Sequence, residues 1–438
     1  MLIMNRIKNL IRIASLLIVM VMGTSSAVAQ LDINISGGTV RGIPIAIVPF
    51  KTAEGEVLET QIDQVIAADL RASGKFEPLF SSDFVSFPSR AEDVRFKDWR
   101  FVDSEILVIG EVWKLGDDSY EIQFHIYDVA REREIGMGKR IPNLRKKDLR
   151  TAAHIISDTV YEAFTGNSGA FNSRIAFIKR SEEEYQRYRY RIMVADWDGY
   201  GEQEVFASWR PLLSPHWSPD SRKISFVSFG TKGSIVQVLD LQTGKQETIA
   251  AFSGVNSAPA WSPDGSKIAY STSKNGSPDV WVYDVFSKQH QRITTHYGID
   301  TEPAWSPDGQ TILFTSNRTG KPQIYAYDMP SGNNIRMTFE GDENANASYD
   351  KDGRNIVMVH EGGQIVVMNE ENSDITTLTN AKFDESPSFS PNGDMVLYAS
   401  EQNYQPSLMV GSSDGRIRTR LEFVSGDVRE PAWSALRR

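Results

Sequence analysis

The stretch Glu302–Ser316, "EPAWSPDGQTILFTS", decides the fold because close versions of it recur along the chain. Further copies read "SPHWSPDSRKISFVS" from Ser214, "SAPAWSPDGSKIAYST" from Ser257 and "ESPSFSPNGDMVLYAS" from Glu385. The aromatic residue of each copy recurs at spacings of 44, 44, 44, 40 and 44 residues, at Trp217, Trp261, Trp305, Tyr349, Phe389 and Trp433. A period of about 40 to 50 residues built from strand-like segments is typical of a β-propeller.

Each copy divides into four predicted strands. The first ends at the aromatic residue, and a Ser-Pro-Asp-Gly turn then reverses the chain, because proline fixes φ and glycine accepts positive φ. An apolar second strand ("TILFTS"), an alternating third ("QIYAYD") and a fourth ending in "RIT", "RMT" or "TLT" follow. A helical repeat is excluded because the apolar period is two residues rather than 3.6, and because Pro and Gly recur at the turn positions.

The count of strands predicts how the ring closes. The last first-strand segment, "PAWS" at 431–434, has nothing after it to form a blade, whereas "SRIAFIKR" (173–180) and "YRIMVADWDGY" (190–200) lack a first strand. The two pieces complete each other. We therefore expect six blades over 167–438, with the innermost strand of the first blade supplied by the C-terminal segment, so that no sheet edge stays open.

A different pattern precedes the repeat. "IPIAIVPF" (43–50), "EILVIGEVWKL", "SYEIQFHIYDV" and "EIGMGKRI" read as strands, and residues 59–76 and 146–166 as helices, the second ending at Gly166. Helices and strands around one sheet predict a small α/β domain over 39–166, followed by the linker "TGNSGAFNS".

The N-terminus carries an export signal. Arg6, Lys8 and Arg12 precede an apolar run and the small residues "AVA" at 27–29, as in a cleaved signal sequence over 1–29. An uncleaved membrane anchor is the alternative. Cleavage would remove three positive charges and change the net charge from -10 to -13.

Residues 30–38, "QLDINISGG", follow the predicted cleavage site. Apolar residues alternate with polar ones and are followed by a Gly-Gly hinge at 37–38, so this segment is either an edge strand of the α/β sheet or a tethered strand that a partner pairs with. The residues concerned are Leu31, Asp32, Ile33, Asn34 and Ile35.

Composition limits the function. A 40% hydrophobic and 24% charged chain has the balance of a soluble globular protein, and the acidic net charge argues against a nucleic-acid surface. With no cysteine, no disulfide holds the fold.

The sequence contains possible catalytic and metal-binding motifs, but the residues around them argue against these functions. "GSSDG" at 411–415 matches G-x-S-x-G, but Ser413 falls in a turn between two propeller strands rather than between a strand and a helix. The six histidines never stand at metal-ligand spacing, and no phosphate-binding glycine loop is present. Asp220, Asp264, Asp308 and Asp352 belong to the Ser-Pro-Asp-Gly type turns. We expect neither an enzyme nor a cofactor.

A second series precedes the first strands: Ser257-Ala258, Asp300-Thr301-Glu302, Asn344–Asn346, Asp384-Glu385-Ser386 and Arg429-Glu430. Because first strands line the axis of a propeller, these residues are expected in loops around the mouth of the central channel. Such a mostly acidic rim can dock a protein loop or hold a cation.

The sequence resembles the TolB family, periplasmic propeller proteins of the Tol-Pal system. The resemblance covers essentially the whole mature chain and rests on "IPIAIVPF", "AADLRASGKFEPL", "DWDGY", "NRTGKPQIYAYD" and the "PAWSPDG" blades in this order. It implies a periplasmic, non-enzymatic adaptor between the lipoprotein Pal and the inner-membrane protein TolA, which supports outer-membrane integrity and constriction at cell division.

The resemblance also implies sites. Pal would contact Val255, Ala258, Thr301 and Glu302, where Val255 stands at a position that is often His in the family, and TolA would contact Leu31–Ile35. Asn256 in the same loop, and Asp384 and Glu385 in the acidic rim, complete the predicted partner-binding set.

Two other classes stay as alternatives. A propeller peptidase would need a hydrolase domain for which the chain has no room. A carbohydrate-binding propeller would need exposed aromatic residues on the rim, whereas the repeated aromatic residues are expected inside strands.

Overall fold

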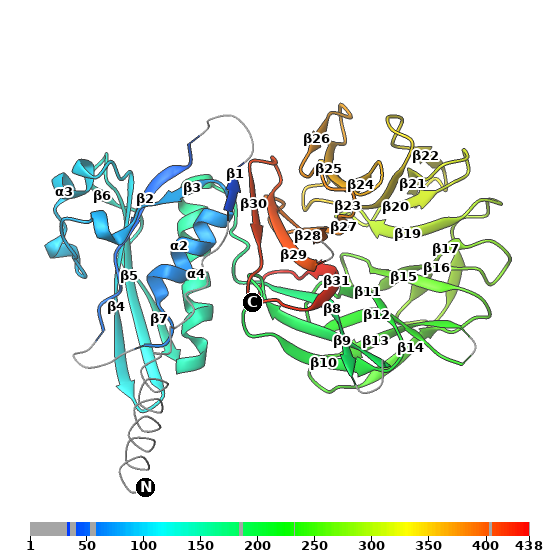
Figure 1. Ribbon diagram of the computed structural model, residues 1–438, viewed down its shortest axis with the longest axis horizontal. Helices are drawn as coiled ribbons and strands as arrows, with labels where there is room; N and C mark the ends of the chain where they lie inside the picture. The colour runs from blue at the N-terminus through cyan, green and yellow to red at the C-terminus, as the bar shows by residue number, and fades with distance from the viewer. Residues whose placement is uncertain are drawn as a thin grey trace, which may run out of the picture. The chain divides into compact units, whose positions relative to one another are not determined.

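The computed structural model describes residues 33–35, 41–52, 58–183, 187–231, 233–402 and 405–437 (Figure 1). The predicted signal sequence, Leu31, Asp32 and the Gly-Gly hinge lie outside these ranges. None of the helices in the described ranges combines the length and the apolar character that crossing a membrane requires.

One sheet organises the N-terminal part, with the strand order β3-β2-β4-β5-β6 and with β7 also paired to β5. β2 runs parallel to β3 and β4, and β4 runs antiparallel to β5. The strands are β2 (Ile43–Ile47), β3 (Phe76–Pro78), β4 (Ile106–Gly116), β5 (Ser119–Asp128), β6 (Arg133–Glu134) and β7 (Lys139–Leu144). This mixed sheet with its helices confirms the predicted α/β class.

The predicted strand "EIGMGKRI" is wrong as a single strand. The chain forms β6 and β7 as two separate pieces, and the intervening Gly136 has φ 77°, which interrupts an extended run. A Cβ on Gly138 would lie 2.4 Å from the ring of His125, which belongs to β5, so the segment that joins β6 to β7 also passes close to β5.

Three α-helices accompany the sheet: α2 (Ile62–Ala72), α3 (Phe96–Phe101) and α4 (Leu149–Thr165). Short 3₁₀ turns are η1 (Ser81–Asp83), η2 (Ala91–Asp93) and η3 (Lys146–Asp148). α2 buries the predicted apolar face, and α4 ends at Gly166 with φ 76°, which confirms the predicted glycine at its C-terminus.

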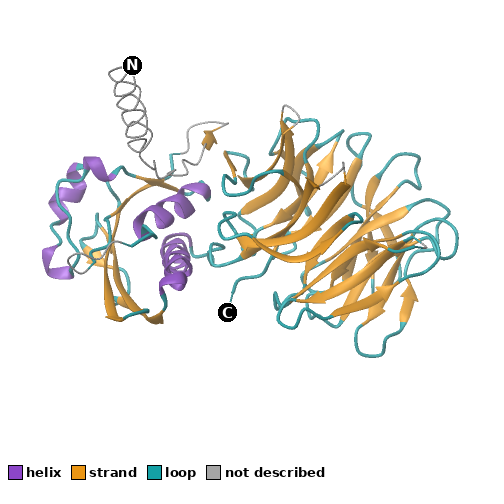
Figure 2. Ribbon diagram, turned by 60° about the horizontal axis from the view of Figure 1, so that its bottom comes forward, coloured by secondary structure: helices purple, strands orange, loops and turns teal. Residues whose placement is uncertain are grey.

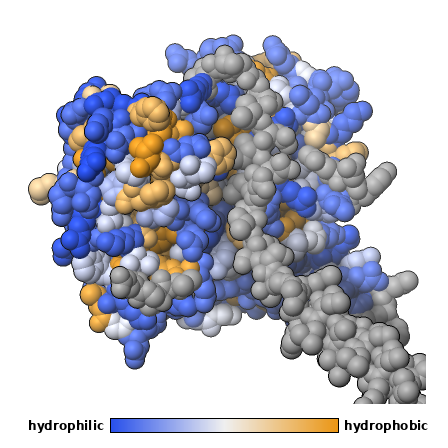
Figure 3. Space-filling view, turned by 60° about the vertical axis from the view of Figure 1, so that its left-hand side comes forward, coloured by the Kyte–Doolittle hydropathy of each residue, from blue (hydrophilic) through white to orange (hydrophobic). Residues whose placement is uncertain are grey.

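Alternate residues of β2 enter two different cores. Ile45 and Ile47 pack with α2 and α4, whereas Ala46, and Val48 directly after the strand, pack with Trp99 and its neighbours on the other face. The segment over this second core leaves large apolar side chains exposed, and Figure 3, which brings this side of the molecule forward, shows hydrophobic patches among hydrophilic side chains. The most exposed ones are Phe80, Phe87 and Phe101.

The repeat forms six four-stranded antiparallel blades (Figure 2). From the innermost strand outward they are β31-β8-β9-β10, β11-β12-β13-β14, β15-β16-β17-β18, β19-β20-β21-β22, β23-β24-β25-β26 and β27-β28-β29-β30. We number them blades 1 to 6 in this order.

The strands of blades 1 to 3 are β31 (Asp427–Trp433), β8 (Arg174–Glu183), β9 (Arg187–Asp196), β10 (Gln203–Ser208), β11 (Leu212–Trp217), β12 (Lys223–Phe229), β13 (Ser234–Asp240), β14 (Gln246–Ala250), β15 (Asn256–Trp261), β16 (Lys267–Thr272), β17 (Asp279–Asp284) and β18 (His290–Arg292). Those of blades 4 to 6 are β19 (Asp300–Trp305), β20 (Thr311–Ser316), β21 (Gln323–Asp328), β22 (Asn334–Arg336), β23 (Asn344–Tyr349), β24 (Asn355–His360), β25 (Gln364–Asn369), β26 (Ile375–Thr377), β27 (Glu385–Phe389), β28 (Met395–Gln402), β29 (Gln405–Ser412) and β30 (Ile417–Arg420).

The C-terminal strand closes the ring, as predicted. β31 pairs antiparallel with β8, with Trp433 opposite Ile175. The Trp433 indole N–H donates to Ser173 Oγ at 2.7 Å, and its ring lies parallel to that of Trp197 at 6.1 Å between centroids. The buried Trp433 therefore joins the last strand to residues more than 230 positions earlier in the chain.

The recurring turn explains the Ser and Asp of each copy. Ser262 Oγ donates to Asp264 Oδ1 at 2.6 Å and accepts the N–H of Lys267 at 2.9 Å, which fastens the turn to the next strand. Hydrogen bonds from Ser262 and Ser266 lower the pKa of Asp264 to about 2. Ser306 and Asp308 repeat the contact in the next blade, so these aspartates belong to turns, as predicted.

A buried polar cluster joins α2, α4 and blade 1. Asp69 accepts hydrogen bonds from His154 Nδ1 at 2.8 Å, Ser157 Oγ at 2.6 Å and Trp197 Nε1 at 3.1 Å. Asp198 lies near enough to Asp69 and His154 for the three to hold a metal ion. However, three donors already occupy the Asp69 carboxylate, and Asp198 pairs with a guanidinium of α4, so we assign the cluster a structural role.

Candidate functional site

All six innermost strands carry the same irregularity near their start. One residue in each has φ between 48° and 54°, and the pairing with the second strand shifts register there, which defines a β-bulge. These six bulge residues are Ser214, Ala258, Glu302, Asn346, Ser386 and Glu430. A left-handed backbone at non-glycine residues persists only where the surroundings hold it, and bulges re-aim the side chains beside them.

The bulges place the predicted rim inside strands rather than in the loops ahead of them. Thr301 and Glu302 lie in β19, and Glu385 lies in β27. The residue two positions before each bulge is buried, with at most 2% of its surface exposed: Leu212, Asn256, Asp300, Asn344, Asp384 and Val428.

The polar members of this buried set hold the blade together. Asp300 pairs with Arg318 at 2.9 Å and accepts a hydrogen bond from Ser316 Oγ at 2.6 Å. Asn256 donates to the backbone carbonyls of Ser234 and Phe252, each at 2.8 Å. These side chains therefore fix the path along which the chain enters each innermost strand.

Carboxylates connect neighbouring blades at the bulges. Glu302 Oε2 accepts the N–H of Asn346 at 2.9 Å and Thr315 Oγ1–H at 2.7 Å. Glu430 of blade 1 accepts the N–H of Ser214 of blade 2 in the same way. Burial raises the pKa of Glu430 to about 7, although the bond from Ser214 opposes this shift.

The connections between blades expose apolar side chains on the face where the innermost strands begin. The exposed fraction reaches 84% for Tyr297 and 71% for both Phe339 and Phe383. Together these connections carry Trp209, Val255, Tyr297, Ile299, Phe339 and Phe383 on this face. Apart from Val255, the sequence analysis did not predict this set, because its members do not recur at one position of the repeat. The available signal was the presence of large apolar residues within otherwise polar connections.

The predicted propeller-site residues differ in accessibility. Val255 is 48% exposed, Glu385 is exposed, and Ala258, Thr301 and Glu302 are partly buried. Asn256 has no exposed surface and Asp384 has 2%. Contact of any of these residues with a partner stays a prediction.

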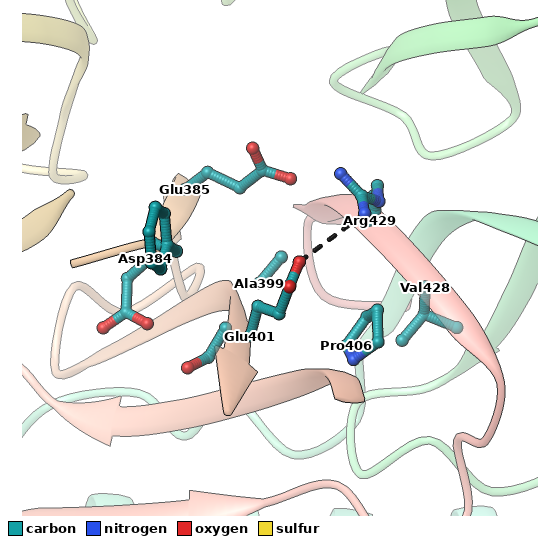
Figure 4. Close-up of a pocket in the computed structure, with 9 residues that line it drawn as sticks. Asp384, Glu385, Ala399, Glu401, Pro406, Val428 and Arg429 are labelled. Carbon is teal, nitrogen blue, oxygen red and sulfur yellow. Dashed lines mark ion pairs between the residues drawn. The ribbon is translucent and has the colours of Figure 1, made fainter. Parts of the chain in front are cut away.

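A pocket of about 180 Å³ opens between blade 6 and blade 1 (Figure 4). Glu385, Glu401 and Arg429 supply its charged groups, and Arg429 NH2 lies 3.7 Å from Glu401 Oε2. The full lining is Phe383, Asp384, Glu385, Ala399, Ser400, Glu401, Pro406, Val428 and Arg429.

The N-terminal strand lies on the propeller. β1 (Ile33–Ile35) pairs antiparallel with β30, the outer strand of blade 6, with Asn34 opposite Arg418. The alternative that it is an edge strand of the α/β sheet is therefore wrong. β30 offers an unpaired outer edge, and β1 adds a fifth strand to it.

The motif around Ser413 has the predicted turn context. Ser413 lies between β29 and β30, and its N–H donates to the carbonyl of Asp394 at 2.9 Å. No helix follows, so the strand–turn–helix support of a hydrolase nucleophile is not formed here.

Two family profiles match the chain: "TolB amino-terminal domain" over residues 31–135 and "TolB beta propeller domain" over residues 161–437. The second covers more than half of the chain.

Comparisons with individual proteins lead to the same family. A protein of Nitrosococcus oceani named "Tol-Pal system protein TolB" is 56% identical over 95% of this chain and 96% of its own length. A protein of the same name from Thioalkalivibrio sulfidiphilus is 52% identical over 96% of this chain and 98% of its own. The crystal structure of TolB from Acinetobacter baumannii superposes with a TM-score of 0.82 at 35% identity, covering 93% of this chain and all of that one.

Proposed function

The chain belongs to the TolB family of Tol-Pal system proteins, and from that premise we propose that it is a periplasmic, non-catalytic adaptor between Pal and TolA. In this role it links Pal, at the outer membrane and peptidoglycan, to the TolA complex of the inner membrane. The adaptor supports the integrity of the outer membrane and its constriction during cell division.

The propeller face where the innermost strands begin is the proposed Pal site. The observation that carries this assignment is the set of large apolar side chains that the connections between blades expose on one face, since exposed apolar surface bordered by polar residues is typical of protein interaction sites. Val255 is the exposed member of the predicted contacts, and Ala258, Thr301 and Glu302 lie beside the bulges that shape this face.

Residues Leu31–Ile35 are the proposed TolA site. Pairing of β1 with β30 supports the segment's capacity to add to a sheet edge, which is the chemistry a partner strand would use. Since β1 cannot pair with β30 and with TolA at once through the same edge, docking on the propeller opposes capture by TolA. Pal binding shifts this balance if it favours one of the two states.

Calorimetry tests the two sites separately. Titration of TolA's periplasmic domain into protein lacking residues 30–38 should give no binding, while binding of Pal is retained. Unchanged TolA affinity would overturn the assignment of the segment.

A substitution tests the Pal face. Val255→Glu should weaken Pal binding by about tenfold or more because it places a charge in an apolar contact. Ile335→Glu is the matched control, since Ile335 is an exposed apolar residue on the outer strand β22. Equal affinities for the two variants would remove Val255 from the interface.

A periplasmic location requires that the chain is exported across the inner membrane. We propose a signal sequence over 1–29, a tethered strand over 30–38, an α/β domain over 39–166 and the propeller over 167–438. Mass spectrometry of the protein from a periplasmic fraction should find a mature N-terminus at Gln30; an intact Met1 would contradict this.

Carbohydrate binding remains a second candidate because of Tyr297, Phe339 and Phe383. The repeated aromatic residues do lie within strands, but these three, outside the repeat, are exposed. Two of them are phenylalanines without a polar group, which favours protein contact. Saturable binding of soluble peptidoglycan fragments that is lost in Tyr297→Ala would favour the second candidate.

A further inference from the structure

The pocket between blades 6 and 1 is too small for a folded ligand or a sugar chain. Pockets for small molecules usually span about 300 to 1,000 Å³, whereas this one has about 180 Å³. It opens on the face proposed for the protein partner, so its size suits one long side chain of that partner.

The charges around the pocket are not balanced. In Figure 4 the carboxylates of Glu385 and Glu401 and the guanidinium of Arg429 approach one another around the opening. Arg429 is already engaged, by Glu401 at 3.7 Å and by Asp427 at 3.0 Å. Across the described ranges, Glu385 has no ion pair within 4.0 Å; burial raises the pKa of its carboxyl, and the nearby charge of Arg429 opposes this shift.

Asp384 adds a second carboxylate, which is satisfied only in part. Its exposed surface is 2%, and Ser400 and Thr379 donate hydrogen bonds to it, but its Oδ1 accepts none from the described residues although the residue lines the pocket. A buried carboxylate oxygen without a donor is costly, so a cationic donor arriving at this wall would be stabilised.

Part of the pocket wall is apolar. Phe383, Ala399, Pro406 and Val428 supply hydrocarbon around the charged groups. Lysine and arginine bury an aliphatic stem against such walls while their cationic head meets carboxylates. A divalent cation is a poorer match, because Arg429 among the same carboxylates repels a charge of +2 twice as strongly as the single charge of a Lys or Arg side chain, and the apolar residues of the wall offer it no ligand atoms.

We propose that this pocket receives a Lys or Arg side chain from the protein that docks on the propeller face. The proposal rests on the proposed function, which makes that protein Pal. It extends the contact around the channel from blades 3 and 4, which carry Val255 and Thr301, to blades 6 and 1.

The test is calorimetry of Pal's periplasmic domain with Glu385→Gln and with Glu343→Gln as the matched control. Both residues are exposed on connections or strand starts of the same face, and Glu343 lies outside the pocket. Glu385→Gln should weaken binding by about tenfold, as expected for loss of a hydrogen bond to a charged group, with its Tm unchanged. Glu343→Gln should bind like the wild type.

The outcomes separate the two proposals. Wild-type protein that does not bind Pal would overturn the proposed function itself. Binding that is equal in the wild type and Glu385→Gln would overturn the pocket while leaving the adaptor role in place. Loss of the Glu385→Gln effect in EDTA would also overturn it, since a metal ion would then be the occupant.

Double-mutant cycles identify the side chain. Replacing each surface Lys and Arg of Pal by Met, in combination with Glu385→Gln, should reveal one cation whose effect disappears in the Glu385→Gln background. Additive effects for every cation would contradict the proposal.

Discussion

Glu302 of blade 4 accepts the backbone N–H of Asn346 of blade 5 at 2.9 Å, and the bulge that this bond stabilises recurs in every blade. Glu302 is thus part of the fold as well as of the proposed docking face. A charge reversal at Glu302 would disturb both at once, which makes Val255 the cleaner probe of binding.

Truncation at this position should destabilise the propeller. Glu302→Ala removes the acceptor of two hydrogen bonds, but the hydroxyl of Thr315 remains 3.0 Å from the N–H of Asn346, so we expect a loss of about 1 kcal/mol. Thermal unfolding measures the change, with the exposed Glu343→Ala as control. A Tm equal to that of the control would show that the bridge contributes nothing.

Glu430 should make stability depend on pH. Its pKa of about 7 in the folded protein lies above the ordinary value of 4.5, so the folded state holds a proton that the unfolded chain releases between these values. The wild type should therefore lose on the order of 1 to 3 kcal/mol relative to Glu430→Gln as the pH rises from 4.5 to 7. Urea unfolding of both proteins at several pH values tests this; parallel curves would contradict it.

The Trp433 side chain should contribute much of the stability of the closed ring. Trp433→Ala removes the ring beside Trp197 and the bond to Ser173, and a buried Trp replaced by Ala costs about 3 to 5 kcal/mol. The control is Trp209→Ala, because Trp209 is 48% exposed. Denaturant unfolding should separate the two variants clearly, and similar stabilities would mean that the closing strand does not depend on this side chain.

Pairing of β1 with β30 should be visible in hydrogen exchange. In the full chain the backbone amides of β30, among them that of Arg418, should exchange more slowly than in protein lacking residues 30–38. β26, the outer strand of blade 5, is the internal control and should be unaffected. Equal exchange of β30 in both proteins would show that the strand does not dock in solution.

The repeat was readable because its signal is local. A period-two apolar pattern between fixed Pro and Gly turns defines each blade, and the unmatched segments at 173–200 and 431–434 had to pair if no edge was to stay open. The helix ending at Gly166 was readable for the same reason, since a left-handed glycine terminates it.

The site was less readable because it depends on contacts between blades. The left-handed backbone at Glu302 and the burial of Asp300 and Asn256 follow from how strands meet around the axis, and the linear pattern shows only polar residues before a strand. The position of β1 could not be predicted from the sequence pattern either. Alternation of apolar and polar residues shows that a segment can form a strand, but not which sheet edge it pairs with.

The closing strand has a consequence for biogenesis. Residues 427–433 complete a blade whose other three strands begin at Arg174, so the ring cannot close until residues 427–433 have been synthesised. Until then the inner edge of β8 has no partner strand. The strand pairing therefore makes ring closure a late step when the chain folds as it is made.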